Sequence, residues 1–294
     1  MKIIRTVEGL KTEVGKAREA GLSVGLVPTM GALHAGHLSL VERARAENDI
    51  VVVSVFVNPT QFNNPADLAT YPRTEEADSQ LLDAAGVDVV FMPTVEEVYP
   101  EPDTRVFNLG PVAEVMEGKM RPGNFNGVAQ IVSKLFYMVE PTRAYFGEKD
   151  FQQIAVIKRM VELEGIDVEI VECPICRADD GLALSSRNVR LSAEQRARAP
   201  RIYKTLCGAV EMSRNASIAE VEKMVTDTLN AEEGMEVEYF TIVDTKTMQP
   251  LAEWPEQGEA VGCITVYCGD VRLIDNIEFR DNRRDKKQDS LKEV

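Results

Sequence analysis

The segment VGLVPTMGALHAGHLSLV, residues 24–41, decides the fold of this chain. Its β-branched beginning predicts a buried strand over residues 24–27, and its apolar positions after residue 37 predict a helix. The loop between them contains Pro28 and Gly31, residues that are typical of turns. The segment therefore predicts a strand, a loop and a helix in direct succession.

The same alternation of short apolar runs and amphipathic stretches continues to about residue 176. Apolar runs occupy residues 50–57, 87–92, 144–146 and 168–171, and amphipathic stretches occupy residues 38–46, 74–85, 128–139 and 154–163. Short apolar strands separated by helices indicate a parallel sheet that is covered on both faces. We therefore predict an α/β fold with a parallel sheet in an N-terminal domain, residues 1–176.

The pattern changes after a loop at residues 177–188. Helical stretches at residues 193–212 and 218–229 precede strands near residues 237–243 and 263–266. Ser217 stands before the second helix and Glu220 follows three residues later, which is the pattern of a capping box. Residues 177–294 are thus predicted to form a smaller α+β domain, with a polar, mobile tail from about residue 280.

The composition limits the possible partners. The chain has 294 residues, 44% hydrophobic and 28% charged, which is ordinary for a globular protein large enough for two domains. Its net charge of −15 argues against binding to nucleic acid or an anionic membrane, because either partner needs a basic face. The N-terminus has no apolar signal region, and no apolar stretch approaches the length of a membrane span. We expect a cytoplasmic protein with no nucleic-acid or membrane partner.

The five cysteines are an odd number in a chain without a secretory signal, which indicates reduced thiols. The segment CPIC places Cys173 and Cys176 at the spacing of a zinc or redox half-site. No second such pair and no nearby histidine completes a tetrahedral site, and the segment belongs to an apolar run. A structural role is favoured, with metal or redox chemistry as the alternative.

The chain has only two histidines, His34 and His37, and both lie where the first helix is predicted to begin. The free N–H groups and the positive dipole of a helix N-terminus form an anion site, and a spacing of three residues places both imidazoles on one face. Gly36 leaves room for a phosphate to approach the backbone. The segment thus favours a site for a transferring phosphoryl group over a surface helix with incidental histidines.

Two further loops fit phosphate chemistry. GEKD offers a tight turn at Gly147, a cation at Lys149 and a carboxylate at Asp150 that could accept from ribose hydroxyls. DGLALSSRN, residues 180–188, offers two hydroxyls and the guanidinium of Arg187 to triphosphate oxygens. Either loop alone could be an ordinary solvent-exposed polar loop. Together with HAGH, the two loops favour a nucleotide-binding site near the boundary between the two predicted domains.

These segments resemble the pantoate–β-alanine ligase (pantothenate synthetase) family of the HxGH nucleotidyltransferase superfamily. The resemblance covers residues 3–276 through VPTMGALHAGH, FVNPTQF, YPRT, GVAQIVSKLF, FGEKDFQQ, DGLALSSRN and RLIDN. It implies a Rossmann-like N-terminal domain, a smaller C-terminal lid domain, a homodimer and dependence on ATP and Mg²⁺. It also implies that ATP and (R)-pantoate give pantoyl adenylate and pyrophosphate, and that β-alanine then displaces AMP to form pantothenate.

The resemblance also assigns roles to individual residues. Gln61 and Gln153 would hold the hydroxyls and carboxylate of pantoate, with Gln61 also near β-alanine. The residues implied in catalysis are His37, which would be the proton donor, His34, Lys149, Ser185 and Arg187. The residues implied in ATP binding are Met30, Gly31, Ala32, Leu33, His34, Ala35, Gly36, His37, Gly147, Glu148, Lys149, Asp150, Cys176, Leu184, Ser185, Ser186 and Arg187.

Three positions depart from the family pattern. Leu184 stands where many relatives have methionine, which is a volume-conserving change. Asn124 stands where many have histidine, which leaves the role of this position open. The acid that helps to place magnesium in some relatives aligns near Ala77, so that Glu76 or Asp78 would have to substitute for it. The metal ligands are otherwise unknown.

Two alternatives stay open at this point. A related nucleotidyltransferase would share HAGH and the phosphate loop but would lack the amine-transfer step. A non-catalytic ATP-binding regulator would bind ATP without turnover. The sequence shows no general base for the amine of β-alanine, which is mainly protonated at pH 7.

Overall fold

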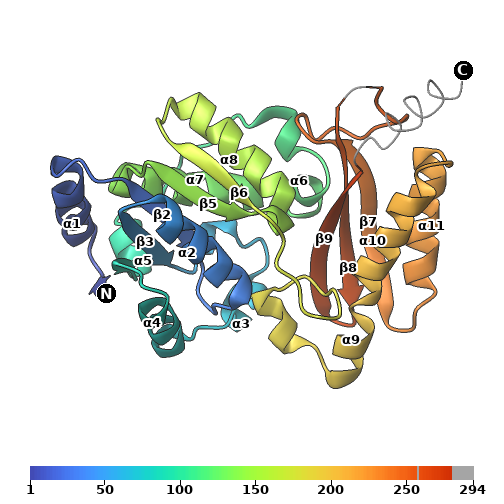
Figure 1. Cartoon of the computed structure of the whole chain (residues 1–294), viewed down its shortest axis with the longest axis horizontal. Coiled ribbons are helices and arrows are strands. Elements are labelled where there is room, and N and C mark those ends of the chain that lie inside the picture. The colour runs from blue at the N-terminus through green and yellow to red at the C-terminus, as the bar shows by residue number, and fades with distance from the viewer. Residues whose placement is uncertain (257, 280–294) are drawn as a thin grey trace, which may run out of the picture. The chain divides into compact units, whose positions relative to one another are not determined.

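The computed structural model describes residues 1–256 and 258–279, and it divides the chain into two compact units (Figure 1). The first unit comprises Met1–Cys176 and Leu184–Ser186, and the second comprises Arg177–Ala183 and the residues from Arg187 onward. The chain thus leaves the first unit after Cys176 and returns to it for three residues. The predicted mobile tail from residue 280 lies outside the described residues.

A six-stranded parallel sheet forms the centre of the first unit. Its strands are β1 (Lys2–Ile4), β2 (Val24–Thr29), β3 (Ile50–Val55), β4 (Val89–Phe91), β5 (Arg143–Gly147) and β6 (Glu169–Cys173). Their order is β1-β4-β3-β2-β5-β6, and every neighbouring pair is parallel. Successive strands progress in one direction from β2 and in the opposite direction from β5. The loops after β2 and β5 therefore diverge, which leaves a crevice at the carboxyl edge of the sheet where ligands of such folds bind.

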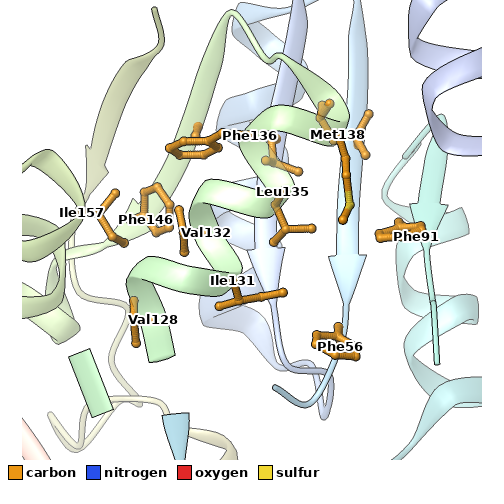
Figure 2. Packing of buried hydrophobic residues seen from close by; sticks show 14 of the residues in the cluster. Phe56, Phe91, Val128, Ile131, Val132, Leu135, Phe136, Met138, Phe146 and Ile157 are labelled. Atoms are coloured by element: carbon orange, nitrogen blue, oxygen red, sulfur yellow. The ribbon is translucent and has the colours of Figure 1, made fainter. Parts of the chain in front are cut away.

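Helices cover both faces of this sheet. The helices of this unit are α1 (Val7–Glu19), α2 (Ala35–Glu47), α3 (Pro65–Thr70), α4 (Glu75–Ala84), α5 (Val95–Val98), α6 (Glu117–Met120), α7 (Asn124–Val139) and α8 (Phe151–Glu164). One buried cluster joins α1, α7 and α8 to the sheet, and another joins α2 and α4 to its opposite face. Figure 2 shows Leu135 and Phe136 of α7 in the first cluster, with Phe91 of β4 and Phe146 of β5. Among the described residues, no helix combines the length and apolar composition needed to cross a membrane.

The second unit has its own sheet and core. The strands β7 (Met235–Asp244), β8 (Ala260–Cys268) and β9 (Val271–Phe279) form an antiparallel sheet in that order. The helices α9 (Ala193–Arg198), α10 (Arg201–Met212) and α11 (Ile218–Asn230) precede it, and α10 and α11 bury apolar side chains with the sheet. The predicted capping box is present, since the hydroxyl of Ser217 accepts from the N–H of Glu220 at 3.3 Å. The predicted α/β class, with a smaller α+β part, is confirmed.

The second unit differs from the prediction in two elements. The single helix expected over residues 193–212 is two helices, because Pro200 has no N–H to continue the first and instead caps the second. The strand β9 was not predicted, since Arg272, Asp275 and Asn276 interrupt its apolar pattern. Asp275 and Asn276 are nevertheless buried, and the guanidinium of Arg177 bonds both oxygens of the Asp275 carboxylate at 2.6 and 2.9 Å.

Candidate functional site

A buried carboxylate fixes the turn between β2 and α2. Ala32 in this turn has a φ of 50°, a left-handed conformation that costs free energy for a residue other than glycine. Asp78, in the first turn of α4 and 1% exposed, accepts from the N–H of Ala32 at 2.9 Å and from the N–H of Leu33 at 2.8 Å. The hydroxyl of Thr74 donates to the same carboxylate at 3.1 Å. These bonds offset the strain and hold the turn in one conformation.

This arrangement argues against Asp78 as a magnesium ligand. Both of its oxygens face donors of the protein, and the side chain is buried. Glu76, the other substitute, is exposed on α4. In the described ranges, no three His, Cys, Asp or Glu side chains come together as a metal site.

The two imidazoles cap the N-terminus of α2. His34 is the N-cap residue, and its Nδ1 accepts from the N–H of Gly36 at 3.1 Å. The backbone N–H of His34 in turn donates to Nδ1 of His37 at 3.3 Å, which completes a capping box made of histidines. The ring centroids are 4.1 Å apart, so both imidazoles share one face as the spacing predicts. Gly36 is required here, because a Cβ atom would lie 2.9 Å from Cε1 of His34.

Both imidazoles are neutral at pH 7. Burial, together with the charge of Lys149, lowers the pKa of His34 to about 4, and the charge of Asp150 opposes this shift only in part. Burial, His34 and Lys149 lower the pKa of His37 to about 3. Because each Nδ1 accepts a hydrogen bond, each neutral ring carries its proton on Nε2. The start of α2 thus has two imidazole Nε2–H groups as hydrogen-bond donors.

The loop after β5 adds a cation to this site. The strand β5 pairs with β2, and the 3₁₀ helix η3 (Glu148–Asp150) follows it directly. Lys149 lies near enough to both histidines to lower their pKa values, and its Nζ is 3.0 Å from the Asp150 carboxylate. The segments HAGH and GEKD, predicted from separate loops, therefore meet where the strand order reverses.

The returning segment Leu184–Ser186 also lies against the turn. The N–H of Leu184 donates to the carbonyl of Cys176 at 3.0 Å, and the hydroxyl of Ser186 donates to the carbonyl of Ala32 at 2.9 Å. The Cβ atom of Cys176 is 3.7 Å from where a Cβ on Gly36 would stand. Of the predicted site residues, Arg187 belongs to the second unit.

Gln61 lies on the 3₁₀ helix η1 (Pro59–Gln61), which follows β3. Its Nε2 donates to Sδ of Met30 at 3.2 Å, so the amide faces the turn after β2. Asn124, whose role the sequence leaves open, is 5% exposed and donates from Nδ2 to the Gln61 carbonyl at 2.6 Å. Gly127 allows this close approach of α7, since a Cβ there would lie 2.3 Å from the carbonyl oxygen of Thr60.

The two adjacent glutamines of FGEKDFQQ have different environments. The amide of Gln152 is buried, with Nε2 donating to the carbonyls of Val112 at 2.9 Å and Val115 at 2.8 Å. Its Oε1 accepts from the N–H of Glu117 at 3.1 Å. Gln153 is partly buried, and its amide makes no hydrogen bond to the part of the chain that is described. Gln152 thus holds the loop before α7, while Gln153 is available to a ligand.

The cysteines are all free thiols in this structure. Cys173 ends β6 and is buried, and burial raises the pKa of its thiol. A buried thiol with a raised pKa is a poor metal ligand and a poor nucleophile. The structural role favoured for the CPIC pair stays the preferred interpretation.

These observations define a class of protein. An open parallel sheet carries a helix N-terminus, two imidazole donors and a lysine at the point where its strand order reverses, which is the arrangement of a nucleotide-binding α/β protein. The chain belongs to the pantoate–β-alanine ligase family, whose family model matches residues 2–278.

Relatives and solved structures agree with this membership. The chain is 63% identical over 282 residues to the pantothenate synthetase of Porphyromonas gingivalis, across 96% of this chain and 100% of that protein. The crystal structure of pantothenate synthetase from Thermus thermophilus has a TM-score of 0.86 and 46% identity, across 95% of this chain and 99% of the other.

A third comparison is with a ligand complex. The pantoate–β-alanine ligase of Francisella tularensis, crystallised with beta-gamma ATP and β-alanine, has a TM-score of 0.77 and 36% identity, across 94% of this chain and 97% of the other. The predicted family is therefore confirmed, and condensation of pantoate with β-alanine is the activity of this family. A nucleotidyltransferase without amine transfer and a non-catalytic regulator are not favoured.

Because the chain has only two histidines, their state can be measured directly. Long-range ¹H–¹⁵N spectra of untagged, ¹⁵N-labelled protein are expected to show both rings as Nε2–H tautomers at pH 7. Since burial lowers both pKa values, both rings should stay neutral down to about pH 5 and titrate below it. A ring that titrates near pH 6.5, or an Nδ1–H tautomer, would contradict the capping arrangement.

The substitution Asp78→Asn tests the carboxylate that holds the turn. One oxygen becomes an NH₂ group that faces a backbone N–H, so the turn should loosen and kcat/KM for ATP should fall about 10- to 100-fold, as for loss of a bond to a charged group. Steady-state kinetics measures this, and Asp83→Asn on the exposed side of α4 is the control. Normal ATP kinetics would contradict the role of this carboxylate in holding the turn, and recovery of Asp78→Asn at high Mg²⁺ would assign Asp78 to the metal instead.

Proposed function

We propose that this chain condenses (R)-pantoate with β-alanine to pantothenate, in an AMP-forming reaction at the carboxyl edge of the six-stranded sheet. The observation that carries the proposal is the pair of neutral imidazoles that cap α2 beside Lys149. A helix N-terminus, two Nε2–H donors and one ammonium group together suit the oxygens of a triphosphate. The amides of Gln61 and Gln153 supply the polar contacts of the acid substrate.

In this proposal ATP binds along the two loops at the strand reversal. The turn at residues 30–37 and the loop at residues 147–150 surround the phosphates and ribose, with Lys149 on phosphate and Asp150 on ribose hydroxyls. Cys176 and Leu184, joined by their backbone hydrogen bond, face the adenine. The hydroxyl of Ser185 and the guanidinium of Arg187 complete the phosphate contacts, and residues 177–294 act as the lid.

The first step is adenylation of pantoate. A carboxylate oxygen of pantoate attacks the α-phosphorus of ATP, the bond to pyrophosphate breaks, and pantoyl adenylate forms. Negative charge develops on phosphate oxygens, and the donors of His34, His37 and Lys149 stabilise it. Because the capping box fixes both rings before the substrate arrives, little reorganisation is needed during the reaction. His37 thus acts as a neutral N–H donor.

Magnesium fits this scheme as an ion that arrives with the nucleotide. Mg²⁺ commonly keeps several waters and binds phosphate oxygens, so it needs few protein ligands. When bound it would neutralise part of the triphosphate charge. The donors of the turn and of Lys149 lie where phosphate oxygens, rather than the metal, would be held.

The second step is attack by the amine. The amine of β-alanine attacks the carbonyl carbon of pantoyl adenylate, the bond to the AMP oxygen breaks, and the amide of pantothenate forms as the amine loses its protons. The low pKa values of His34 and His37 make both imidazoles poor bases for an ammonium group with a pKa near 10. Neither is therefore assigned to this proton transfer.

The proposal also includes the assembly and location of the protein: it forms a homodimer and is located in the cytoplasm.

Exchange between ATP and labelled pyrophosphate tests the first step. It should require pantoate but not β-alanine, and His37→Ala should slow it about 10²- to 10³-fold, as for loss of one preorganised donor. His34→Asn is the matched variant for the other ring, because asparagine keeps a good N-cap but has no imidazole. Exchange that needs β-alanine, or histidine variants within threefold of wild type, would contradict the scheme.

Substitutions of Gln153 and of its neighbour Gln152 are expected to affect different properties, pantoate binding in the first case and stability in the second. Gln61→Ala and Gln153→Ala should lower kcat/KM for pantoate about 10-fold or more with little change in the ATP constant, because substrate oxygens lose their partners. Gln152→Ala should instead lower the thermal unfolding temperature, since it removes three hydrogen bonds to partly buried backbone groups. Equal damage to the ATP and pantoate constants in Gln61→Ala would mean that the pocket is misassigned.

A further inference from the structure

The amide of Gln61 lies at the end of a chain of polar side chains. Its Oε1 accepts from Nδ2 of Asn58 at 3.1 Å. Oδ1 of Asn58 accepts from the hydroxyl of Tyr99 at 2.8 Å and from the hydroxyl of Thr60 at 3.3 Å. Asn58 is 1% exposed, so the orientation of its amide depends on these partners and not on solvent. Asn58 is the N-cap residue of η1, Gln61 ends η1, and Tyr99 directly follows α5 (Val95–Val98).

The direction of this chain is fixed at its centre. Nδ2 of Asn58 also donates to the carbonyl of Gly127 at 3.1 Å, and a backbone carbonyl can only accept. Nδ2 must therefore face Gly127 and Gln61, and Oδ1 must face Tyr99. Gln61 then presents Oε1 to Asn58 and Nε2 to the turn after β2.

The amide of Gln61 is left with a hydrogen to donate. Its Nε2 carries two hydrogens, and the partner it has among the described residues is the thioether of Met30, which is a weak acceptor. One N–H can therefore reach an acceptor oxygen of a substrate. If the Gln61 amide were turned by 180°, its carbonyl oxygen would face the substrate and would repel a carboxylate.

The surroundings of Tyr99 favour its hydroxyl as the donor that begins this series of hydrogen bonds. Its ring packs on Phe56, with centroids 6.3 Å apart, and Nζ of Lys134 lies 5.1 Å from its centroid. Burial raises the pKa of Tyr99, so the hydroxyl keeps its proton and can donate. The other donor to Asn58, from Thr60, is longer and comes from an exposed side chain.

We infer that Tyr99 is a positioning residue for pantoate recognition: its hydroxyl, together with the Gly127 carbonyl, fixes the Asn58 amide, which in turn holds the amide of Gln61 with the N–H side toward the oxygens of the acid substrate. This inference rests on the proposed assignment of Gln61 to pantoate. It also gives the site a preference, since a fixed N–H donor selects a substrate that offers a hydroxyl or carboxylate oxygen and discriminates against one that lacks it.

The substitution Tyr99→Phe removes the hydroxyl and keeps the ring on Phe56. The Oδ1 side of Asn58 then has only the longer bond from Thr60. The Gly127 carbonyl still directs Nδ2 of Asn58, so the amide of Gln61 keeps its direction but is held less firmly. We expect kcat/KM for pantoate to fall about 3- to 10-fold, the usual net effect of one hydrogen bond, with the KM for ATP unchanged. Tyr137→Phe is the matched control, because the hydroxyl of Tyr137 bonds Glu164 at 2.8 Å on the surface of the same unit.

A double-mutant cycle separates this role from a structural one. In a Gln61→Ala background, Tyr99→Phe should have no further effect on kcat/KM for pantoate, because the group it positions is gone. Independent, multiplicative effects would overturn the inference while leaving the proposed function intact. So would loss of folding in Tyr99→Phe, which would show that the hydroxyl serves the fold. If Gln61→Ala alone left kcat/KM for pantoate unchanged, the assignment of Gln61 would fail and the role of Tyr99 with it.

Discussion

The hydrogen bonds from Ala32 and Leu33 to the buried carboxylate of Asp78 set the geometry on which the site depends. They hold a left-handed residue in the turn after β2, so that α2 begins at Ala35 with its N-terminus at the carboxyl edge of the sheet. The two imidazoles can then cap this helix and present Nε2–H groups. The position of β5 beside β2 brings Lys149 to the same edge. The imidazole donors therefore depend on the conformation of this turn, and the sheet topology adds Lys149 beside them.

Because the chain has a negative net charge, binding of a triphosphate depends on these local hydrogen-bond donors. A protein with a net charge of −15 does not attract a triphosphate through its overall field. The site instead concentrates a few positive or donating groups, namely the free N–H groups of a helix, two neutral imidazoles and one ammonium group. Keeping the histidines neutral also avoids repulsion from Lys149, which itself lowers their pKa values. Binding of an anion by an acidic protein thus depends on placement more than on charge.

The sequence could predict the parts of the site that are local in the chain. HAGH and GEKD follow strands that their apolar residues make evident, and the neighbouring glycines and helix starts show the chemistry. It could not predict Asp78, Asn124 or Tyr99 as supporting residues, because their partners lie 46, 63 and 41 residues away. A single sequence has no signal for such pairings. The same reason explains β9, whose buried Asp275 is tolerated only because Arg177 bonds it from 98 residues away.

The central claim is that the pantoate carboxylate attacks the α-phosphorus of ATP at the capped start of α2. The most direct measurement uses pantoate labelled with ¹⁸O in both carboxylate oxygens, followed by mass spectrometry of the products of one turnover. The account predicts one ¹⁸O atom in AMP and none in pyrophosphate, because the attacking oxygen leaves with the AMP. Transfer of ¹⁸O into inorganic phosphate or pyrophosphate, or AMP that contains no label, would contradict it.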